Sequence, residues 1–274
     1  MVKNSRKSNL WKYILSVIII GIHFVPIYIL ISVAFKSPKD LSSKWELPGY
    51  LYLDNFVTAL GKSNFIQALI NTGIITVIAV MGIAFVGAVT AYPLARNRSV
   101  FNRLVKGFIM GVMMIPPLSI LVPLYSMMAG MGGISSYWGI IIVLFTFQLP
   151  TSIYLYCNFI SAIPIGLEEA AAIDGCGPFR TFLYIIMPQL KPVTASVAII
   201  TGINCWNNYQ FALYLLQSPR MRTVTLAIAS FFSQDSSNIN GAAAAALLGI
   251  SPVIILFLIL QKYFIQGAID SALK

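Results

Sequence analysis

The chain is poor in charged residues, which make up 9% of its 274 positions, whereas hydrophobic residues make up 58%. A soluble domain carries about 25% charged residues. A chain this depleted in charge cannot bury all of its apolar side chains in one soluble core, so lipid must be the solvent for much of its surface. The composition therefore excludes an ordinary soluble protein and indicates a membrane protein.

Residues that serve catalysis and metal binding are also scarce. The chain has one histidine, His23, and three widely separated cysteines, Cys157, Cys176 and Cys205. None of the cysteines forms a CxxC pair, so neither a disulfide framework nor a zinc site is indicated. There is no Walker A loop, no Gly-x-Ser-x-Gly and no His-Glu-x-x-His. We therefore expect no catalytic residue, no metal site and no cofactor bound by this chain.

The few charged residues are bunched, and long charge-free runs separate them. A spanning helix needs about 20 apolar residues, so the 61-residue run over 107–167 holds two spans, separated by a Gly/Ser turn over 130–136. We therefore predict an all-α membrane protein, a single domain over 1–274 with six transmembrane helices. The predicted spans are 13–35, 66–94, 107–129, 138–161, 193–216 and 242–262.

The basic residues indicate how the chain is oriented. With the N-terminus in the cytoplasm, 12 Lys and Arg residues fall on the cytoplasmic side and 6 on the outside, as the positive-inside rule expects. The net charge of +10 then orients the protein against an anionic leaflet, and nucleic acid is not a partner. The first apolar run also resembles a signal peptide, but its 23 residues exceed the usual length of about 7–15. We therefore predict a retained first span and cytoplasmic N- and C-termini.

A polar segment over 163–191 separates the fourth and fifth spans. Its first part predicts a short helix over about 165–174, since Glu168 and Glu169 fall in the first turn, where the helix dipole favours negative charge. Gly175 follows, and it suits a helix end that needs a left-handed residue. The segment thus predicts a helix that ends in a glycine elbow.

The second part of the segment predicts another helix over about 178–187, closed by Pro188. Two rigid helices joined by an elbow can carry a push from a soluble partner into the neighbouring spans. An amphipathic loop that lies on the lipid headgroups is the alternative.

The fifth span is the most polar of the six. If it is one helix, Asn204, Asn207 and Asn208 place three amides on one face. Amides exchange hydrogen bonds and aromatic rings offer flat apolar surface, and an uncharged polyhydroxylated solute uses both. The predicted substrate path is Asn204, Trp206, Asn207, Asn208, Tyr209 and Gln210. Hydrogen bonding between helices and, for the two aromatic residues, interfacial anchoring are the alternatives.

Two further features of the spans bear on transport. No acidic residue falls inside any predicted span, which speaks against a proton symporter because such carriers relay protons through intramembrane acids. The third span contains Pro116, Pro117 and Pro123, which bend a helix by removing backbone hydrogen bonds. The bend is either a gate or a packed kink.

The segment over 163–191 closely resembles the EAA loop of ABC-importer permeases: Glu-Ala-Ala, three residues, Gly, nine residues, then Ile-x-Met-Pro. Other stretches resemble the carbohydrate-uptake class of these permeases, of the maltose-type second subunit, including Ala91–Arg96, Trp206–Asn207 and Gln261–Phe264. The resemblance implies the type I importer permease fold with cytoplasmic coupling helices. The residues that it assigns to ATPase coupling are Glu168, Glu169, Ala170, Ala171, Asp174, Gly175 and Pro188.

The same resemblance implies the partners and the setting. It predicts a heterodimer with a second permease in the bacterial plasma (inner) membrane, two cytoplasmic ATPase subunits that consume ATP with Mg, and an extracellular solute-binding protein. The solute is then a sugar, and an oligosaccharide in particular. A polyol or glycerol-phosphate permease of the same architecture is one alternative. An ion-coupled secondary carrier is another, although it calls for intramembrane charges or an inverted repeat.

Overall fold

The computed structural model describes residues 5–61, 64–233 and 236–272. Lys3, Lys62 and Lys274, which count in the predicted charge balance, lie outside the described residues. The chain divides into two compact units. The first comprises residues 1–65 and 227–251, and the second comprises residues 66–226 and 252–274.

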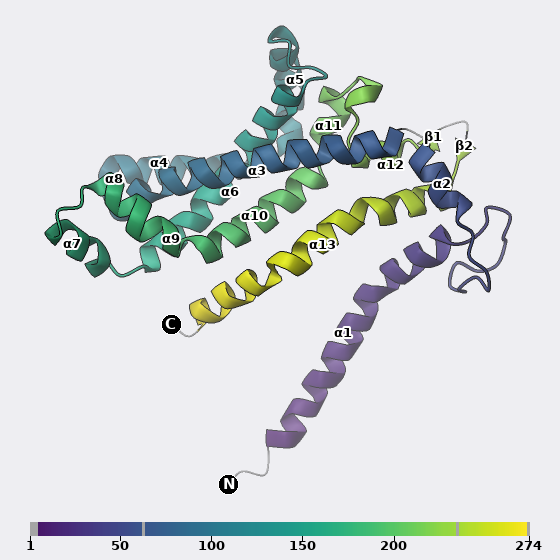
Figure 1. Ribbon diagram of the computed structural model, residues 1–274, viewed down its shortest axis with the longest axis horizontal. Helices are drawn as coiled ribbons and strands as arrows, with labels where there is room; N and C mark the ends of the chain where they lie inside the picture. The colour runs from purple at the N-terminus through teal and green to yellow at the C-terminus, as the bar shows by residue number, and fades with distance from the viewer. Residues whose placement is uncertain (1–4, 62–63, 234–235, 273–274) are drawn as a thin grey trace. The chain divides into compact units, whose positions relative to one another are not determined.

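The first unit holds the N-terminal helix and the start of the C-terminal one (Figure 1). Its elements are α1 (Ser5–Ala34), α2 (Asp54–Gly61), a small hairpin of β1 (Phe232–Ser233) and β2 (Ser236–Ser237), and the first part of α13 (Ile239–Ala272). Two asparagine side chains donate hydrogen bonds to backbone carbonyl oxygens at the end of α1 and just after it. Asn55 donates to the carbonyl oxygens of Ala34 and Lys36 at 2.8 and 2.7 Å, and Asn240 donates to those of Val33 and Lys36 at 3.0 Å each.

The second unit is helical in its described part. Its elements are α3 (Phe65–Arg96), α4 (Val100–Val112), the 3-10 turn η2 (Pro117–Ile120), α5 (Leu121–Gly130), α6 (Tyr137–Ala162), α7 (Gly166–Ile173), α8 (Pro178–Thr181), the π-helical turn η3 (Phe182–Ile186), α9 (Met187–Gln189), α10 (Lys191–Trp206), α11 (Gln210–Leu215), the 3-10 turn η4 (Pro219–Met221), the first half of α12 (Val224–Ala229) and the end of α13.

The core of the second unit lies where α3, α6 and α10 pack together. Ile83 of α3, Tyr156 of α6 and Val197 of α10 are fully buried there. A Cβ on Gly87 of α3 would lie 2.1 Å from the hydroxyl oxygen of Ser152 on α6, so only glycine permits this approach of the two helices. Small residues allow such close helix contacts in membranes.

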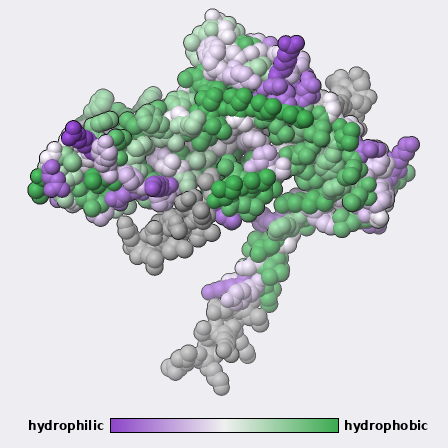
Figure 2. Space-filling model, in the orientation of Figure 1, coloured by the Kyte–Doolittle hydropathy of each residue, from purple (hydrophilic) through white to green (hydrophobic). Residues whose placement is uncertain are grey.

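Four helical segments among the described residues are long and apolar enough to cross a membrane: Trp11–Ala34, Phe65–Arg96, Tyr137–Ala162 and Ile239–Ile259. Two bent pairs, Val100–Val112 with Pro117–Gly130 and Pro178–Gln189 with Lys191–Trp206, raise the number to six if each pair is one span. Apolar side chains cover much of the exposed surface of α3 (Figure 2), as a lipid-facing helix requires. The all-α prediction is confirmed, and the six predicted spans are consistent with this arrangement.

Two predicted spans differ from the observed helices. The span predicted over 107–129, with a bend at its prolines, is broken into two helices, because α4 ends at Val112 and the chain turns by 90° before α5. Pro116 and Pro117 cause the break, since neither offers a backbone N–H and each restricts the residue before it. The proline bend itself was predicted, but whether it acts as a gate stays a prediction.

The span predicted over 193–216 is not one continuous helix. The helix α10 ends at Trp206, and α11 begins only at Gln210. The side chain of Asn208 accepts a hydrogen bond from the backbone N–H of Ala212 at 3.2 Å. Asparagine competes with the helix for backbone groups in this way, which favours an end and a new start over a continuous helix.

Candidate functional site

The segment over 163–191 forms a helix, an elbow and a second helix. The first helix, α7, ends in a Schellman motif. The backbone N–H of Gly175 bonds to the carbonyl oxygen of Ala172 at 3.1 Å, and that of Cys176 bonds to the carbonyl oxygen of Ala171 at 2.9 Å. Gly175 has a φ of +80°, which a residue with a Cβ adopts only at a cost. The predicted helix and its left-handed glycine are therefore confirmed.

The second helix extends further than predicted. It runs through α8, η3 and α9 to Gln189, so Pro188 lies inside it and does not close it at 187. The turn before the proline is π-helical, with the N–H of Met187 bonded to the carbonyl oxygen of Phe182. This wider turn accommodates a proline ring that would clash in a regular α-helix. The chain then bends by 71° into α10.

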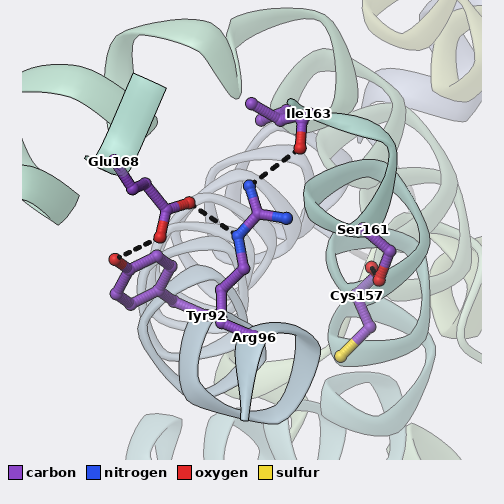
Figure 3. A network of polar contacts seen from close by, with 6 residues as sticks. All are labelled: Tyr92, Arg96, Cys157, Ser161, Ile163 and Glu168. Carbon is purple, nitrogen blue, oxygen red and sulfur yellow. Dashed lines mark hydrogen bonds and ion pairs between the residues drawn. The ribbon is translucent and has the colours of Figure 1, made fainter. Parts of the chain in front are cut away.

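Glu168 binds the protein's own α3 helix (Figure 3). Its carboxylate accepts a hydrogen bond from Nε of Arg96 at 2.6 Å and another from the hydroxyl of Tyr92 at 3.0 Å. Arg96 also donates to the carbonyl oxygen of Ile163, at the start of the loop, at 3.0 Å. Both side chains of the ion pair are 15% exposed. Glu168, a predicted ATPase-coupling residue, thus holds the loop to the end of α3.

Ring packing adds to this attachment. The rings of Tyr92 on α3 and Phe182 on the second loop helix have centroids 5.1 Å apart, and Phe182 is buried. In the sequence, Arg96 and Tyr92 stand out only as part of a family-like stretch, because no spacing rule relates residue 96 to residue 168. The one sequence signal that could have predicted this ion pair is that a base, Arg96, and an acid, Glu168, each follow the end of a predicted span.

The remaining predicted coupling residues divide into an exposed set and one buried residue. Ala171 is 5% exposed, because α7 packs with this side against α8 and η3. The Ala171 side chain is therefore used in packing within the loop, and its role in close approach of a partner stays a prediction. The residues that stay exposed are Glu169, Ala170, Asp174, Gly175 and Pro188.

The predicted substrate path is only partly brought together. Asn204 on α10 donates to the side-chain oxygen of Gln148 on α6 at 3.2 Å, and this contact is exposed. Asn207 lies at the C-cap of α10 and is exposed. The predicted common face of three amides is wrong, because the helix that would carry it ends at Trp206.

The other path residues have mixed surroundings. Asn208 uses its side chain to start α11, and its carbonyl oxygen accepts a hydrogen bond from the Thr225 hydroxyl at 2.9 Å. Trp206 lines a small apolar cavity of about 50 Å³ beside Pro252. Tyr209 and Gln210 are exposed. An amide pair, Asn204 with Gln148, is the best-formed polar element of the predicted path.

Within the described residues, no three His, Cys, Asp or Glu side chains lie close enough together to hold a metal ion. The single histidine, His23, has Nδ1 at 2.7 Å from the carbonyl oxygen of Ile19, one turn earlier in the same helix.

Comparison with known proteins identifies the family. Residues 83–269 match the sequence model of a protein family, the binding-protein-dependent transport system inner membrane component. The chain is 40% identical to the melibiose/raffinose/stachyose import permease protein MelC of Bacillus subtilis, over 95% of each chain. It is 30% identical to the multiple sugar-binding transport system permease protein MsmG of Streptococcus mutans, over 100% of each chain.

A solved structure is similar in fold. A chain of a bacterial ABC transporter involved in the import of the acidic polysaccharide alginate matches with a TM-score of 0.80 and 22% identity, over 96% of this chain and 99% of that chain. The likeness confirms the type I importer permease fold. The chain belongs to the family of binding-protein-dependent transport system inner membrane components, the permease subunits of ABC importers.

Proposed function

We propose that this chain is the permease subunit of an ATP-driven importer for sugars, and for oligosaccharides in particular. The observation that carries the proposal is 40% identity over 95% of the chain to a permease named for melibiose, raffinose and stachyose. The exposed amide pair of Asn204 and Gln148 supports it, since amides can both donate to and accept from sugar hydroxyls.

The loop over 163–191 binds a cytoplasmic ATPase subunit through its exposed face. Glu169, Ala170 and Asp174 are exposed on α7 and at its end, and Glu169 makes no side-chain hydrogen bond or ion pair within the described part of the chain. Its carboxylate is thus available to a partner. Arg96 and Glu168 hold α7 to α3 from the inside. Movement of the ATPase is then transmitted to α3 through the ion pair of Arg96 and Glu168. It is transmitted to α6 and α10 through the backbone, because the loop connects these two helices.

The assembly that follows has four kinds of protein subunit. This chain pairs with a second, related permease, and two ATPase subunits hydrolyse ATP with Mg on the cytoplasmic side. An extracellular solute-binding protein delivers the sugar. Both termini of this chain lie in the cytoplasm, in agreement with the 12 to 6 distribution of its basic residues.

Polyols and glycerol phosphates are the other candidate solutes. An anionic solute favours Lys or Arg along the path, and the predicted path residues from 204 to 210 include none. An ion-coupled secondary carrier is excluded by membership of a binding-protein-dependent family.

Uptake by the complete transporter tests the proposal. Vesicles holding both permeases, the ATPases and the binding protein are supplied with labelled raffinose, sorbitol or glycerol 3-phosphate. We expect ATP-dependent accumulation of the oligosaccharide, and none when the ATPase is a hydrolysis-deficient variant. Accumulation of glycerol 3-phosphate or sorbitol in place of raffinose would contradict the assigned solute.

A further inference from the structure

A basic pocket lies beside the coupling loop, at the end of α3, the start of α4 and the end of α6. Its volume is about 590 Å³, within the range of about 300–1,000 Å³ that is usual for ligand pockets. Four cationic side chains line it, and no acidic residue does. These four residues, which define the basic pocket, are Arg96, Arg98, Arg103 and Lys106.

Most of the positive charge in this pocket is not neutralised by the protein. Glu168 forms an ion pair with Arg96, but Arg98, Arg103 and Lys106 form no ion pair in the described part of the chain. The uncharged polar side chain Asn102 is already occupied, because it donates to the carbonyl oxygens of Pro93 and Asn97. Like charges gathered around a cavity repel one another, so an anion in the cavity stabilises the arrangement.

The helix α4 has the character of an interfacial helix. Val100, Phe101, Leu104 and Phe108 share one face at helical spacing and are 66–74% exposed, while Arg103 and Lys106 lie on the opposite side, which lines the pocket. None of the residues of α4 is buried. A helix of this kind lies in the headgroup region with its apolar face toward the acyl chains.

We infer that the basic pocket binds the headgroup of an anionic phospholipid. The phosphate lies among the guanidinium groups of Arg98 and Arg103 and the ammonium group of Lys106, since guanidinium groups match phosphate oxygens in charge and geometry. The acyl chains lie beside the exposed apolar face of α4. The sequence alone assigns these residues only to membrane orientation, whereas the structure gathers them around one cavity.

Lipid titration of the complete transporter, followed by native mass spectrometry, tests the inference. Phosphatidylglycerol and phosphatidylcholine are added separately to the protein with Arg103→Gln/Lys106→Gln and to the wild type. Each basic residue contributes about a fivefold change in binding near an anionic headgroup, so the double variant binds phosphatidylglycerol about 25-fold more weakly. The matched control, Lys39→Gln/Lys44→Gln, removes two exposed cations outside the pocket and outside the coupling loop and leaves this affinity unchanged.

A milder variant and a soluble competitor complete the test. If the double variant does not fold, Arg98→Gln, which alters an exposed residue between helices, weakens phosphatidylglycerol binding about fivefold. Equal affinity of variant and wild type, or equal binding of phosphatidylcholine, overturns the inference. Displacement of the lipid by an equal concentration of glycerol phosphate also overturns it, because the site is then one for soluble phosphate esters.

Discussion

Two neighbouring glutamates in the coupling loop provide a sharp prediction, because the structure gives them different roles. Glu168 accepts hydrogen bonds from Arg96 and Tyr92, whereas Glu169 is exposed. We expect Glu168→Gln to destabilise the permease itself. The same substitution at Glu169 leaves stability unchanged and impairs ATPase binding.

The magnitude follows from the burial of the ion pair. Exposed pairs contribute about 0.2–1 kcal/mol, and removing one partner of a fully buried pair costs about 3–5 kcal/mol. Both side chains here are 15% exposed, which lies between these limits and nearer to the buried one. Glutamine keeps one acceptor oxygen and loses the charge. We therefore expect Glu168→Gln to lower the free energy of unfolding by about 1–3 kcal/mol.

Equilibrium unfolding in mixed micelles measures this effect. Cys157 and Cys205 are buried, so their reaction with a maleimide dye reports unfolding. The partly exposed Cys176 is replaced by serine in every variant. A double-mutant cycle of Glu168→Gln with Arg96→Gln then isolates the interaction free energy of the pair.

Two results would refute the reasoning. An interaction free energy below about 0.5 kcal/mol is no more than independent sites give, and it would mean that the pair does not hold the loop. Equal destabilisation by Glu168→Gln and Glu169→Gln would mean that the burial seen here does not distinguish the two carboxylates.

Three further predictions concern other parts of the chain. Gly175→Ala, at a φ of +80°, lowers the free energy of unfolding by about 1–2 kcal/mol, whereas Gly177→Ala, at a φ of −75°, changes it little. The unfolding assay above compares the two variants, and equal effects would contradict the role of Gly175 as the elbow. Gly87→Ala places a methyl carbon 2.1 Å from a hydroxyl oxygen of α6, so we expect reduced stability in the same assay, restored in part when that α6 serine is replaced by glycine. Hydrogen bonds from Ser42, and then from a tyrosine, lower the pKa of Asp40 from 3.8 to about 2. These hydrogen bonds thus stabilise the loop after α1 above about pH 4, and the stabilisation is lost as the pH falls through about 2. Amide hydrogen exchange of this loop, compared between the wild type and Asp40→Asn, measures the effect. A difference between the two proteins at pH 4 that persists below pH 2 would contradict this expectation.

The sequence predicts the long helices and the elbow because local chemistry determines them. The run of apolar residues over 138–161 predicts α6 to within one residue at each end, since lipid-facing helices need a minimum apolar length. Gly175 follows a short helix and occupies the left-handed position expected of it. Both features depend on residues that are close together in the chain.

The sequence does not predict features that depend on distant contacts. The end of α10 at Trp206 depends on whether the Asn208 side chain accepts a hydrogen bond from the Ala212 N–H. The hydropathy of the sequence does not indicate whether that hydrogen bond forms. The pairing of Arg96 with Glu168 joins residues 72 positions apart. The burial of Ala171 follows from the packing of α7 on the second loop helix, which the loop's sequence alone does not specify.

Thiol labelling of the coupling loop tests the central claim, which is that the segment over 163–191 faces the cytosol and binds a separate ATPase. A cysteine is introduced by Ala172→Cys, at an exposed position of α7 that is not an assigned coupling residue, in the background of Cys176→Ser, since the other two cysteines are buried. A membrane-impermeant maleimide should label it in inverted vesicles and not in intact cells, and addition of the ATPase subunit should protect it. Labelling in intact cells, or labelling in inverted vesicles that the ATPase does not reduce, would contradict the account.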